Sequence, residues 1–212
     1  MARRGRSRPR RSPAPAERQR DAERTRRALL DAALIEFSSK GRAGARVSEI
    51  AARAGVDKQL ISYYFGGKDG LYRTLVQRWL DAEREFAPPD LPLDDLVASY
   101  VTQGARDRDL ARLLLRESID DDQDAGPDPQ QQTLDDAVAD MRRRQEAGEI
   151  AQDLDPAYML LLFEGAASVS VTFPGDVRHA TGLDPASAEF AEVYAEQLRR
   201  VVRRLAETPP DD

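Results

Sequence analysis

The stretch VSEIAARAGVDKQLISYYF, from Val47 to Phe65, reads as two short helices joined by a tight turn. Gly55 ends the first helix, because a residue without a Cβ adopts the left-handed conformation of a helix C-terminus without penalty. Asp57 is placed to accept hydrogen bonds from the free amides of the second helix as its N-cap. Val56 and Ile61 have the spacing of a hydrophobic staple, which sets the angle at which the second helix begins. The stretch therefore predicts a helix pair with a fixed crossing angle.

Such a pair has two interpretations. Two helices held at a steep angle by a short glycine turn form a helix-turn-helix, whose second helix can enter the major groove of DNA. An ordinary corner between two helices of a globular domain produces the same pattern. The flanking residues bear on the choice between them.

The charge of the chain is strongly polarised. Residues 1–79 carry 19 Lys and Arg against 8 Asp and Glu, a net charge of +11. Residues 80–212 carry 13 against 30, a net charge of −17, so the overall charge of −6 conceals the difference. A basic N-terminal third suits a polyanion, and the acidic remainder would be repelled from one. This asymmetry favours nucleic acid as a partner of the N-terminal third.

Composition also argues against several classes of protein. The chain has no cysteine and a single histidine, His179, so we expect no disulfide framework, no metal site and no cofactor. The N-terminus is too polar for a signal peptide, and we expect a cytoplasmic protein. The most apolar run, Tyr158–Phe173, is too short to cross a bilayer and contains Glu164, which predicts a buried helix and no membrane partner.

Residues 1–20 form a segment of Arg, Pro, Ser and Ala with almost nothing to bury, so we expect it to be disordered in isolation. Two interpretations of its arginines compete. They form a solvated tail without a specific role, or an arm that adds phosphate contacts or enters a narrow minor groove of DNA. The helix-turn-helix downstream favours the arm.

Helices are predicted on both sides of the helix-turn-helix. Between Asp21 and Ser39 apolar residues recur at helical spacing, and Gly41 and Gly44 end that helix. A further helix begins at Lys68, where the free amides and the helix dipole already favour an anion. A lysine there is suited to hold a DNA phosphate, although an ordinary exposed lysine would look the same.

Residues 24–79 resemble the DNA-binding domain of the tetracycline-repressor (TetR) family of bacterial transcription regulators. The matching segments are RRALLDAALIEFSSKG and VSEIAARAGVDKQLISYYFGGKDGLY, within residues 24–79. The elements IA..AGV and YYF..K..L keep their relative spacing, and it is their combination that is specific. The resemblance covers about a quarter of the chain at the level of motifs.

The chain departs from the family pattern at several positions. The family often has Thr or Ser where Arg46 stands, and small residues where Gln59 and Leu60 stand. It often has Tyr at the position of Ser62. These positions face bases or backbone in the family, so its operator sequences do not transfer to this chain.

The resemblance implies one recognition helix, residues 58–64, in each subunit of a two-fold dimer bound to a palindromic operator. Lys58, Gln59, Ser62 and Tyr63 are the candidates for base contacts, since Lys and Gln can pair with the edges of G and A. Arg46, Ser48, Tyr64 and Lys68 are the candidates for backbone contacts, which set position rather than sequence. Ile61 and Phe65 are expected in the core.

The remainder of the chain is predicted to be helical, so the fold class is all-α. Apolar spacing predicts helices over residues 93–105 and 109–119, and the run DDDQDAGPD predicts an exposed acidic loop without the spacing of a calcium site. Asp-Pro pairs at 128–129, 155–156 and 184–185 each place an N-cap before a proline at N1, which predicts helices starting near 129, 156 and 185. Gly148 is expected to close the first of these.

Two helices, over residues 156–173 and 185–206, are candidates for a homodimer interface. The first is apolar on most faces and needs cover on most faces, which a second subunit can supply. In the TetR family the last two long helices pair with their symmetry mates as a four-helix bundle. The same stripes would also serve as the core of a monomer.

The resemblance further implies a cavity for a small-molecule effector among the helices between about 93 and 173. A ligand there would select a state whose recognition helices are wrongly spaced for DNA. The aromatic and sulfur-containing side chains that are candidates to line it, each of which could equally be plain core, are Trp79, Tyr100, Met141, Tyr158 and Phe163.

The predicted organisation is an Arg-rich arm over residues 1–20, a helix-turn-helix domain over 21–79, a helical effector and dimerisation domain over 80–208, and a disordered tail over 209–212. The predicted function is a DNA-binding transcriptional regulator, repression being favoured over activation. A non-specific architectural DNA-binding protein without an effector and a helical protein-interaction module are the alternatives. An enzyme is disfavoured, because His179 sits in a predicted Gly- and Pro-flanked loop without a nucleophile elbow or phosphate loop nearby.

Overall fold

The computed structural model describes residues 15–119 and 129–206, which form ten helices and no strand. This confirms the all-α class. The helices are α1 (Pro15–Gly44), α2 (Val47–Ala54), α3 (Gln59–Phe65), α4 (Lys68–Phe86), α5 (Leu93–Arg106), α6 (Arg108–Ile119), α7 (Pro129–Glu146), α8 (Pro156–Thr172), α9 (Pro174–Thr181) and α10 (Ala188–Leu205).

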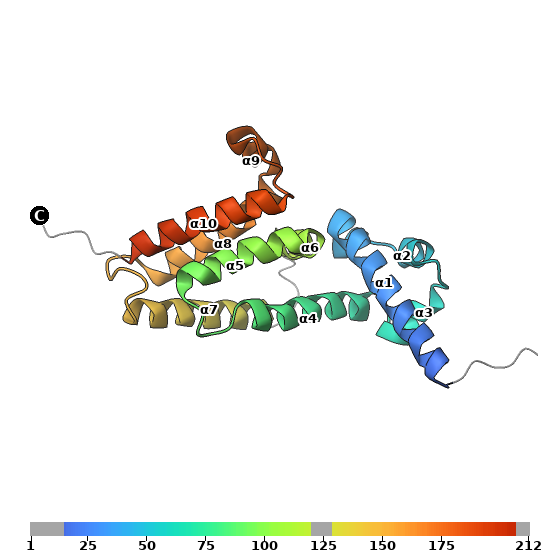
Figure 1. Cartoon of the computed structure of the whole chain (residues 1–212). Helices are drawn as coiled ribbons and strands as arrows, with labels where there is room; N and C mark the ends of the chain where they lie inside the picture. The colour runs from blue at the N-terminus through green and yellow to red at the C-terminus, as the bar shows by residue number, and fades with distance from the viewer. Residues whose placement is uncertain (1–14, 120–128, 207–212) are drawn as a thin grey trace, which may run out of the picture.

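The helices form two groups joined by α4 (Figure 1). Helices α1, α2 and α3 gather at one end, and α5, α7, α8 and α10 make up the body at the other, while α9 projects from it. Helix α4 runs without interruption through the boundary predicted between residues 79 and 80. The two groups therefore share a continuous helix.

The core of the N-terminal group extends onto a helix of the body. Its fully buried side chains include Leu29 and Phe37 of α1, Ile50 of α2, Ile61 of α3 and Leu71 of α4. Leu110 and Leu113 of α6 belong to the same cluster. Helix α6 of the body therefore packs directly on the end of the molecule that carries α2 and α3.

Local turn chemistry follows the sequence closely around α2 and α3. Gly55 has φ 69° and ψ 30°, the left-handed conformation predicted for it. The carboxylate of Asp57 accepts a hydrogen bond from the Gln59 amide at 2.8 Å, although α3 itself begins at Gln59. Helix α1 breaks at Gly41, where φ is 70° and ψ is 169°.

Three sequence-based expectations are wrong. Residues 15–20, placed in the disordered arm, form the first turns of α1, whereas residues 1–14 and the acidic run at 120–128 lie outside the described residues. His179 lies exposed on a helix, α9, rather than in a loop. The last long helix begins at Ala188 instead of near 185, because the Ser187 hydroxyl accepts from the Phe190 amide at 3.1 Å and caps it.

Within the described part of the chain, no single helix is long and apolar enough to cross a membrane. Helices α8 and α9 reach that length and apolarity only together, and they are bent by 86° where they meet.

Candidate nucleic-acid interface

Helix α3 presents a polar face outward and an apolar face inward. The four candidates for base contacts are exposed: Lys58 at the N-cap of α3, and Gln59, Ser62 and Tyr63 within the helix. Tyr63 is 78% exposed. Ile61 and Phe65 are buried, as predicted, and join the cluster with α1 and α4. The helix is thus anchored by its core side chains and leaves its polar side chains free to reach the floor of a groove.

Tyr63 and Tyr64 lie at the boundary between these faces. Their rings meet edge to face, with centroids 4.9 Å apart, and Tyr64 packs partly against the core cluster. The Arg26 guanidinium of α1 sits over the Phe65 ring at 5.2 Å. The cation–π contact therefore links α3 to α1, and the ring contact lies within α3 itself.

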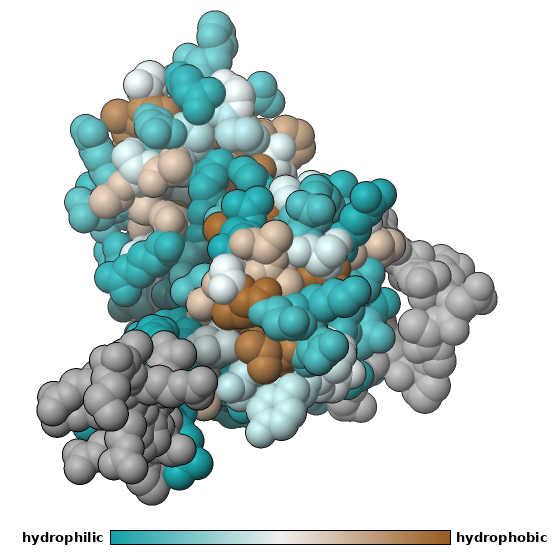
Figure 2. All heavy atoms as spheres, turned by 90° about the vertical axis from the view of Figure 1, so that its right-hand side faces the viewer, coloured by the Kyte–Doolittle hydropathy of each residue, from teal (hydrophilic) through white to brown (hydrophobic). Residues whose placement is uncertain are grey.

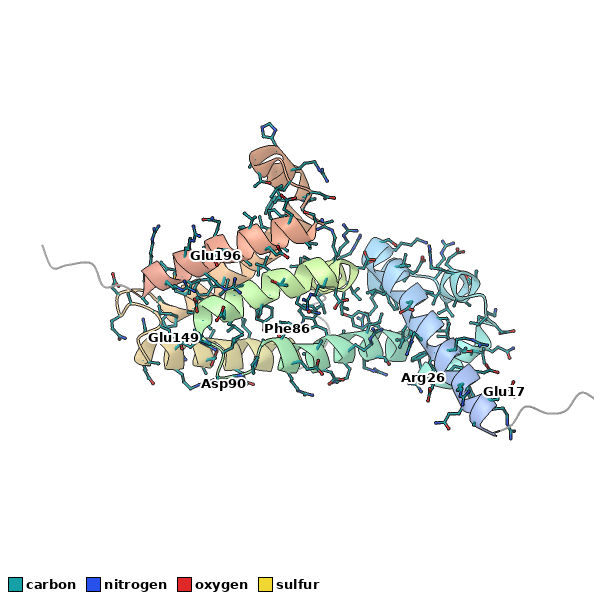
Figure 3. All side chains as sticks on the ribbon, in the orientation of Figure 1. Glu17, Arg26, Phe86, Asp90, Glu149 and Glu196 are labelled. Carbon is teal, nitrogen blue, oxygen red and sulfur yellow. The ribbon has the colours of Figure 1, made fainter. Side chains whose placement is uncertain are left out.

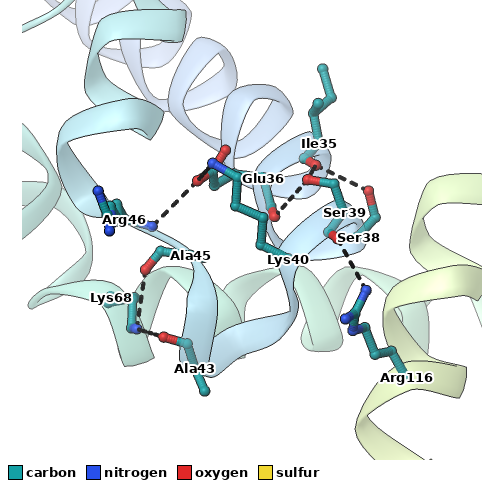
Figure 4. Close-up of polar contacts among 10 residues, drawn as sticks. All are labelled: Ile35, Glu36, Ser38, Ser39, Lys40, Ala43, Ala45, Arg46, Lys68 and Arg116. Carbon is teal, nitrogen blue, oxygen red and sulfur yellow. Dashed lines mark hydrogen bonds and ion pairs between the residues drawn. The ribbon is translucent and has the colours of Figure 1, made fainter.

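Arg46 and Ser48 lie exposed at the beginning of α2, beside the connection from α1. Arg46 occupies the N-cap position, and its side chain makes no capping hydrogen bond. Its backbone amide instead donates to Oε1 of Glu36, a residue of α1, at 3.4 Å (Figure 4). The start of α2 is thus held by a side chain from another helix.

Glu36 is a residue of this region that the sequence prediction missed. Its side chain is almost fully buried, with the residue 1% exposed, and Nζ of Lys40 donates to it at 2.7 Å. This hydrogen bond lowers the pKa of Glu36 below its ordinary value of 4.5, although burial acts in the opposite direction. The signal in the sequence was an acidic residue beside Phe37 on the apolar stripe of α1, with a lysine four residues later.

Lys68 begins α4, as predicted, and lies half-buried against the same connection. Its Nζ donates to the carbonyl oxygens of Ala43 at 3.3 Å and Ala45 at 3.2 Å (Figure 4). An ammonium group has three N–H donors, so these two bonds leave one for a further acceptor. Lys68 therefore ties the α1–α2 connection to α4.

A third charged side chain reaches this region from the body. Nη1 of Arg116, on α6, donates to the carbonyl oxygen of Ser39 at 3.0 Å (Figure 4). Together with the shared core, this bond links α6 to the end of α1 next to the Gly41 break. The surface at this end of the molecule is largely hydrophilic (Figure 2).

The candidate effector residues fall into separate places. Trp79 contacts the ring of Phe86 at 5.5 Å between centroids, and Phe86 contacts that of Tyr100 at 5.2 Å, so three aromatic rings connect α4 to α5. Figure 3 labels Phe86, the middle ring of the three. The Tyr100 hydroxyl donates to Oε1 of Glu83 at 2.7 Å. Burial and this neighbouring carboxylate raise the pKa of Tyr100 above its ordinary 10.0.

The other three candidates lie deeper in the body or on its surface. Met141 and Phe163 are buried in one apolar cluster with residues of α5 and α10. Tyr158 is 70% exposed on α8. Two surface clefts, of about 210 and 430 Å³, are lined by other residues, the first around Asp140 and Arg144 and the second around Arg26 and Arg78.

Helices α8 and α10 carry large apolar side chains that this chain does not cover. Those that are about half exposed or more are Tyr158, Leu161, Leu162 and Phe173 on or next to α8, and Val193 and Val201 on α10. Residues spaced three and four apart along a helix lie on one face. The uncovered side chains therefore form stripes along both helices.

The geometry of α1–α4 agrees with a sequence comparison. The family model described as "Bacterial regulatory proteins, tetR family" matches residues 29–75, which contain α2, α3 and their supports on α1 and α4. The chain belongs to the TetR family. It is therefore a transcriptional regulator of a family that is not enzymatic, and the family implies operator DNA and a small-molecule effector as partners.

Relatives of the TetR regulator extend the likeness beyond the matched segment. The transcriptional repressor SCO4008 of Streptomyces coelicolor is 29% identical over 189 residues, which cover 87% of this chain and 98% of that protein. The A-factor receptor protein of Streptomyces griseus is 26% identical over 89% of this chain and 66% of its own length. The regulator RutR of Escherichia coli K12 is 37% identical over 81 residues, 36% of this chain and 38% of RutR.

Solved structures of the same fold cover most of the TetR regulator. The crystal structure of SCO4942 from Streptomyces coelicolor aligns with a TM-score of 0.65 at 24% identity, over 84% of this chain and 97% of that one. GusR of Salmonella enterica aligns with a TM-score of 0.57 at 21% identity, over 87% and 96% of the two chains.

Proposed function

We propose that this chain is a repressor that binds a palindromic or near-palindromic operator as a homodimer in the cytoplasm, and that a small molecule in its C-terminal domain releases it. The observation that carries the proposal is the exposed polar face of α3, anchored through Ile61 and Phe65. A helix can contact base edges in a major groove when its backbone is held rigidly and its polar side chains are exposed.

In this proposal the interface residues divide into two roles. Base edges are read by Lys58, Gln59, Ser62 and Tyr63, whereas phosphates are held by Arg46, Ser48, Tyr64 and Lys68. The free N–H of Lys68 serves its phosphate, since its other two donors hold the α1–α2 connection. The arginines at the N-terminus add an arm to the domain of residues 21–79.

The proposed dimer uses α8 and α10 within the domain of residues 80–208. Support comes from the uncovered apolar stripes on both helices, since large contiguous apolar surfaces of this kind mark interaction sites. In a two-fold dimer the same patch on each subunit covers the other. The dimer places two α3 helices in successive major grooves, about one helical turn apart.

The proposed effector binds among α4, α5, α7 and α8. Support comes from the run of rings from Trp79 to Tyr100 and from the Glu83 carboxylate bonded to Tyr100, which together offer apolar faces and a polar group. Met141, Phe163 and Tyr158 would complete the lining after a rearrangement. Because Trp79 is the single tryptophan, its fluorescence is a direct reporter for a ligand screen.

The first prediction concerns DNA binding and its dependence on salt. Wild type is expected to bind the DNA flanking its own gene about a thousandfold more tightly than a scrambled duplex of equal length. Lys68→Ala is expected to weaken binding to both duplexes, with a slope of log K against log salt shallower by about 0.9 for each phosphate that the variant no longer neutralises. Fluorescence anisotropy over a series of salt concentrations measures both quantities.

The exposed Arg84 of α4 provides the control, since Arg84→Ala also removes one positive charge from this helix but far from α2 and α3. Its salt slope should match that of wild type. Equal binding of wild type to both duplexes would favour the architectural alternative, in which the arm binds DNA without sequence preference. No binding at low salt would refute the proposed function.

The second prediction concerns the dimer. Leu161→Glu places a charge in the centre of the uncovered stripe of α8, where Leu161 is 58% exposed, and a charge buried without a partner is strongly unfavourable. We expect the variant to sediment as a monomer with unchanged helix content, whereas wild type sediments as a dimer. Leu134→Glu, the same change at a leucine of α7 that is 46% exposed and lies on neither α8 nor α10, is the matched control. A dimer that persists in Leu161→Glu would place the interface elsewhere.

A further inference from the structure

We infer that Glu36 is a positioning residue for DNA binding, because its buried side chain holds the backbone at the start of α2 and so orients Arg46 and Ser48 toward the phosphates. The inference rests on the proposed function and adds to it a residue that does not itself touch DNA.

The start of α2 needs such a support. The first amides of any helix lack partners within the helix, and Ser, Thr, Asp or Asn usually supplies one from the N-cap position. Here the N-cap is Arg46, whose side chain cannot accept a hydrogen bond. The amide of Arg46 itself is bonded instead from α1, since Oε1 of Glu36 accepts from it at 3.4 Å, as the N3 glutamate of a capping box would.

The position of the Glu36 carboxylate is itself well defined. The residue is 1% exposed, and Nζ of Lys40 donates to the same Oε1 atom at 2.7 Å. Its backbone neighbour Phe37 is fully buried in the core shared by α1, α2, α3 and α4. A carboxylate that is packed and paired in this way has one geometry available, so it transmits the position of α1 to α2.

The α1–α2 connection is therefore held from both sides by opposite charges. Glu36 takes the amide of Arg46 on one side, and Lys68 takes the carbonyl oxygens of Ala43 and Ala45 on the other (Figure 4). Donors and acceptors of the connection that would otherwise need water are bonded to side chains whose helices belong to the core. Arg46 and Ser48 leave this connection directly toward solvent, so their direction depends on it.

The test compares two variants that each remove one negative charge. Glu36→Gln removes the buried charge, and Glu49→Gln removes an exposed charge in the first turn of α2. Electrostatics alone predicts that both variants bind DNA more tightly, because fewer negative charges face the phosphates. A positioning role predicts the reverse for Glu36→Gln, about a tenfold loss of affinity, because the uncharged amide oxygen of glutamine is a weaker acceptor for the Arg46 amide and for Lys40 than the carboxylate. Affinities are measured on the upstream fragment and on a random duplex at low salt.

A double-mutant cycle separates positioning from a merely structural role. If Glu36 acts through Arg46, then Glu36→Gln adds little loss of affinity in an Arg46→Ala background. If Glu36 only stabilises the fold, the Glu36→Gln variant melts at a lower temperature than wild type, but well below that temperature it binds DNA with the affinity of wild type. This result would overturn the inference. If the Gln variant does not fold, Glu36→Asp replaces it in this test, because its shorter side chain keeps the charge but moves the carboxylate away from the Arg46 amide.

The outcomes also separate this inference from the proposed function. Tight binding by wild type with equal affinities for Glu36→Gln and Glu49→Gln overturns the positioning role and leaves the regulator intact. Absence of DNA binding by wild type overturns both.

Discussion

Gly70→Ala is expected to abolish specific DNA binding and to destabilise the protein by about 3 kcal/mol, the upper range for overpacking a core. Gly70 lies in the first turn of α4, and a Cβ added there would stand 1.6 Å from the carbonyl oxygen of Phe65 and 2.8 Å from its carbonyl carbon. Both atoms are backbone, so no side chain can rotate away. The end of α3 and the start of α4 must separate, which turns the exposed face of α3 away from its groove.

Thermal unfolding and operator affinity together measure this effect. Gly104→Ala is the matched control, because Gly104 is a buried helical glycine of α5 with nothing within 4 Å of an added Cβ. Helix propensity alone predicts that this control gains up to about 1 kcal/mol. A Gly70→Ala variant that melts and binds like wild type would show that α3 and α4 accommodate the methyl group without moving.

Arg144→Met is expected to lower the free energy of unfolding by about 3 kcal/mol, the lower end of the range for breaking a buried ion pair. The Arg144 side chain is 6% exposed, and it bonds Asp140 at 2.8 Å, Glu149 at 3.2 Å and the Leu91 carbonyl oxygen at 2.9 Å. Glu149 in turn accepts from the Leu93 amide at 2.6 Å and so caps α5. One guanidinium therefore joins α7, the α4–α5 connection and, through Glu149, the start of α5.

Urea unfolding at one fixed protein concentration measures this change, since the stability of a dimer depends on concentration. The adjacent Arg143 is the control: it pairs with the same Asp140 at 2.8 Å, but its side chain is 65% exposed. Exposed pairs contribute little, so Arg143→Met should lose less than about 1 kcal/mol. If both variants lose the same free energy of unfolding, burial of Arg144 does not strengthen the contribution of its ion pairs and hydrogen bonds to stability.

Features that depend on neighbouring residues could be predicted from the sequence. Gly55 takes the left-handed conformation, Asp57 bonds the Gln59 amide, and Pro129 and Pro156 begin helices after aspartates. For Asp57 and Asp155 the side chain and the amide that it satisfies lie two residues apart. Such interactions form almost irrespective of the rest of the fold, which is why the helix-turn-helix and its family resemblance were visible in the sequence.

The start of the last helix shows where this reasoning stops. Asp184 and Ser187 are both good caps, and local chemistry does not choose between them. In the structure Asp184 accepts from the Ala186 amide in a turn, while Arg108 of α6 donates to the Pro185 carbonyl oxygen at 3.1 Å and Pro185 is fully buried. A residue 77 positions away therefore favours the turn at 184–187 and leaves Ser187 as the cap.

The helical class, the helix-turn-helix and the polar face of α3 could be predicted from the amino-acid sequence, because capping, turn and periodicity signals are local. Three features became visible in the folded chain: Glu36 bonds the start of α2, two donors of Lys68 bond Ala43 and Ala45, and Tyr158 lies outside the core. These outcomes depend on how α1 packs against α4 and α6 and on which face of α8 the body covers. Packing brings together groups that are distant in the sequence, and local periodicity and capping patterns do not predict such contacts.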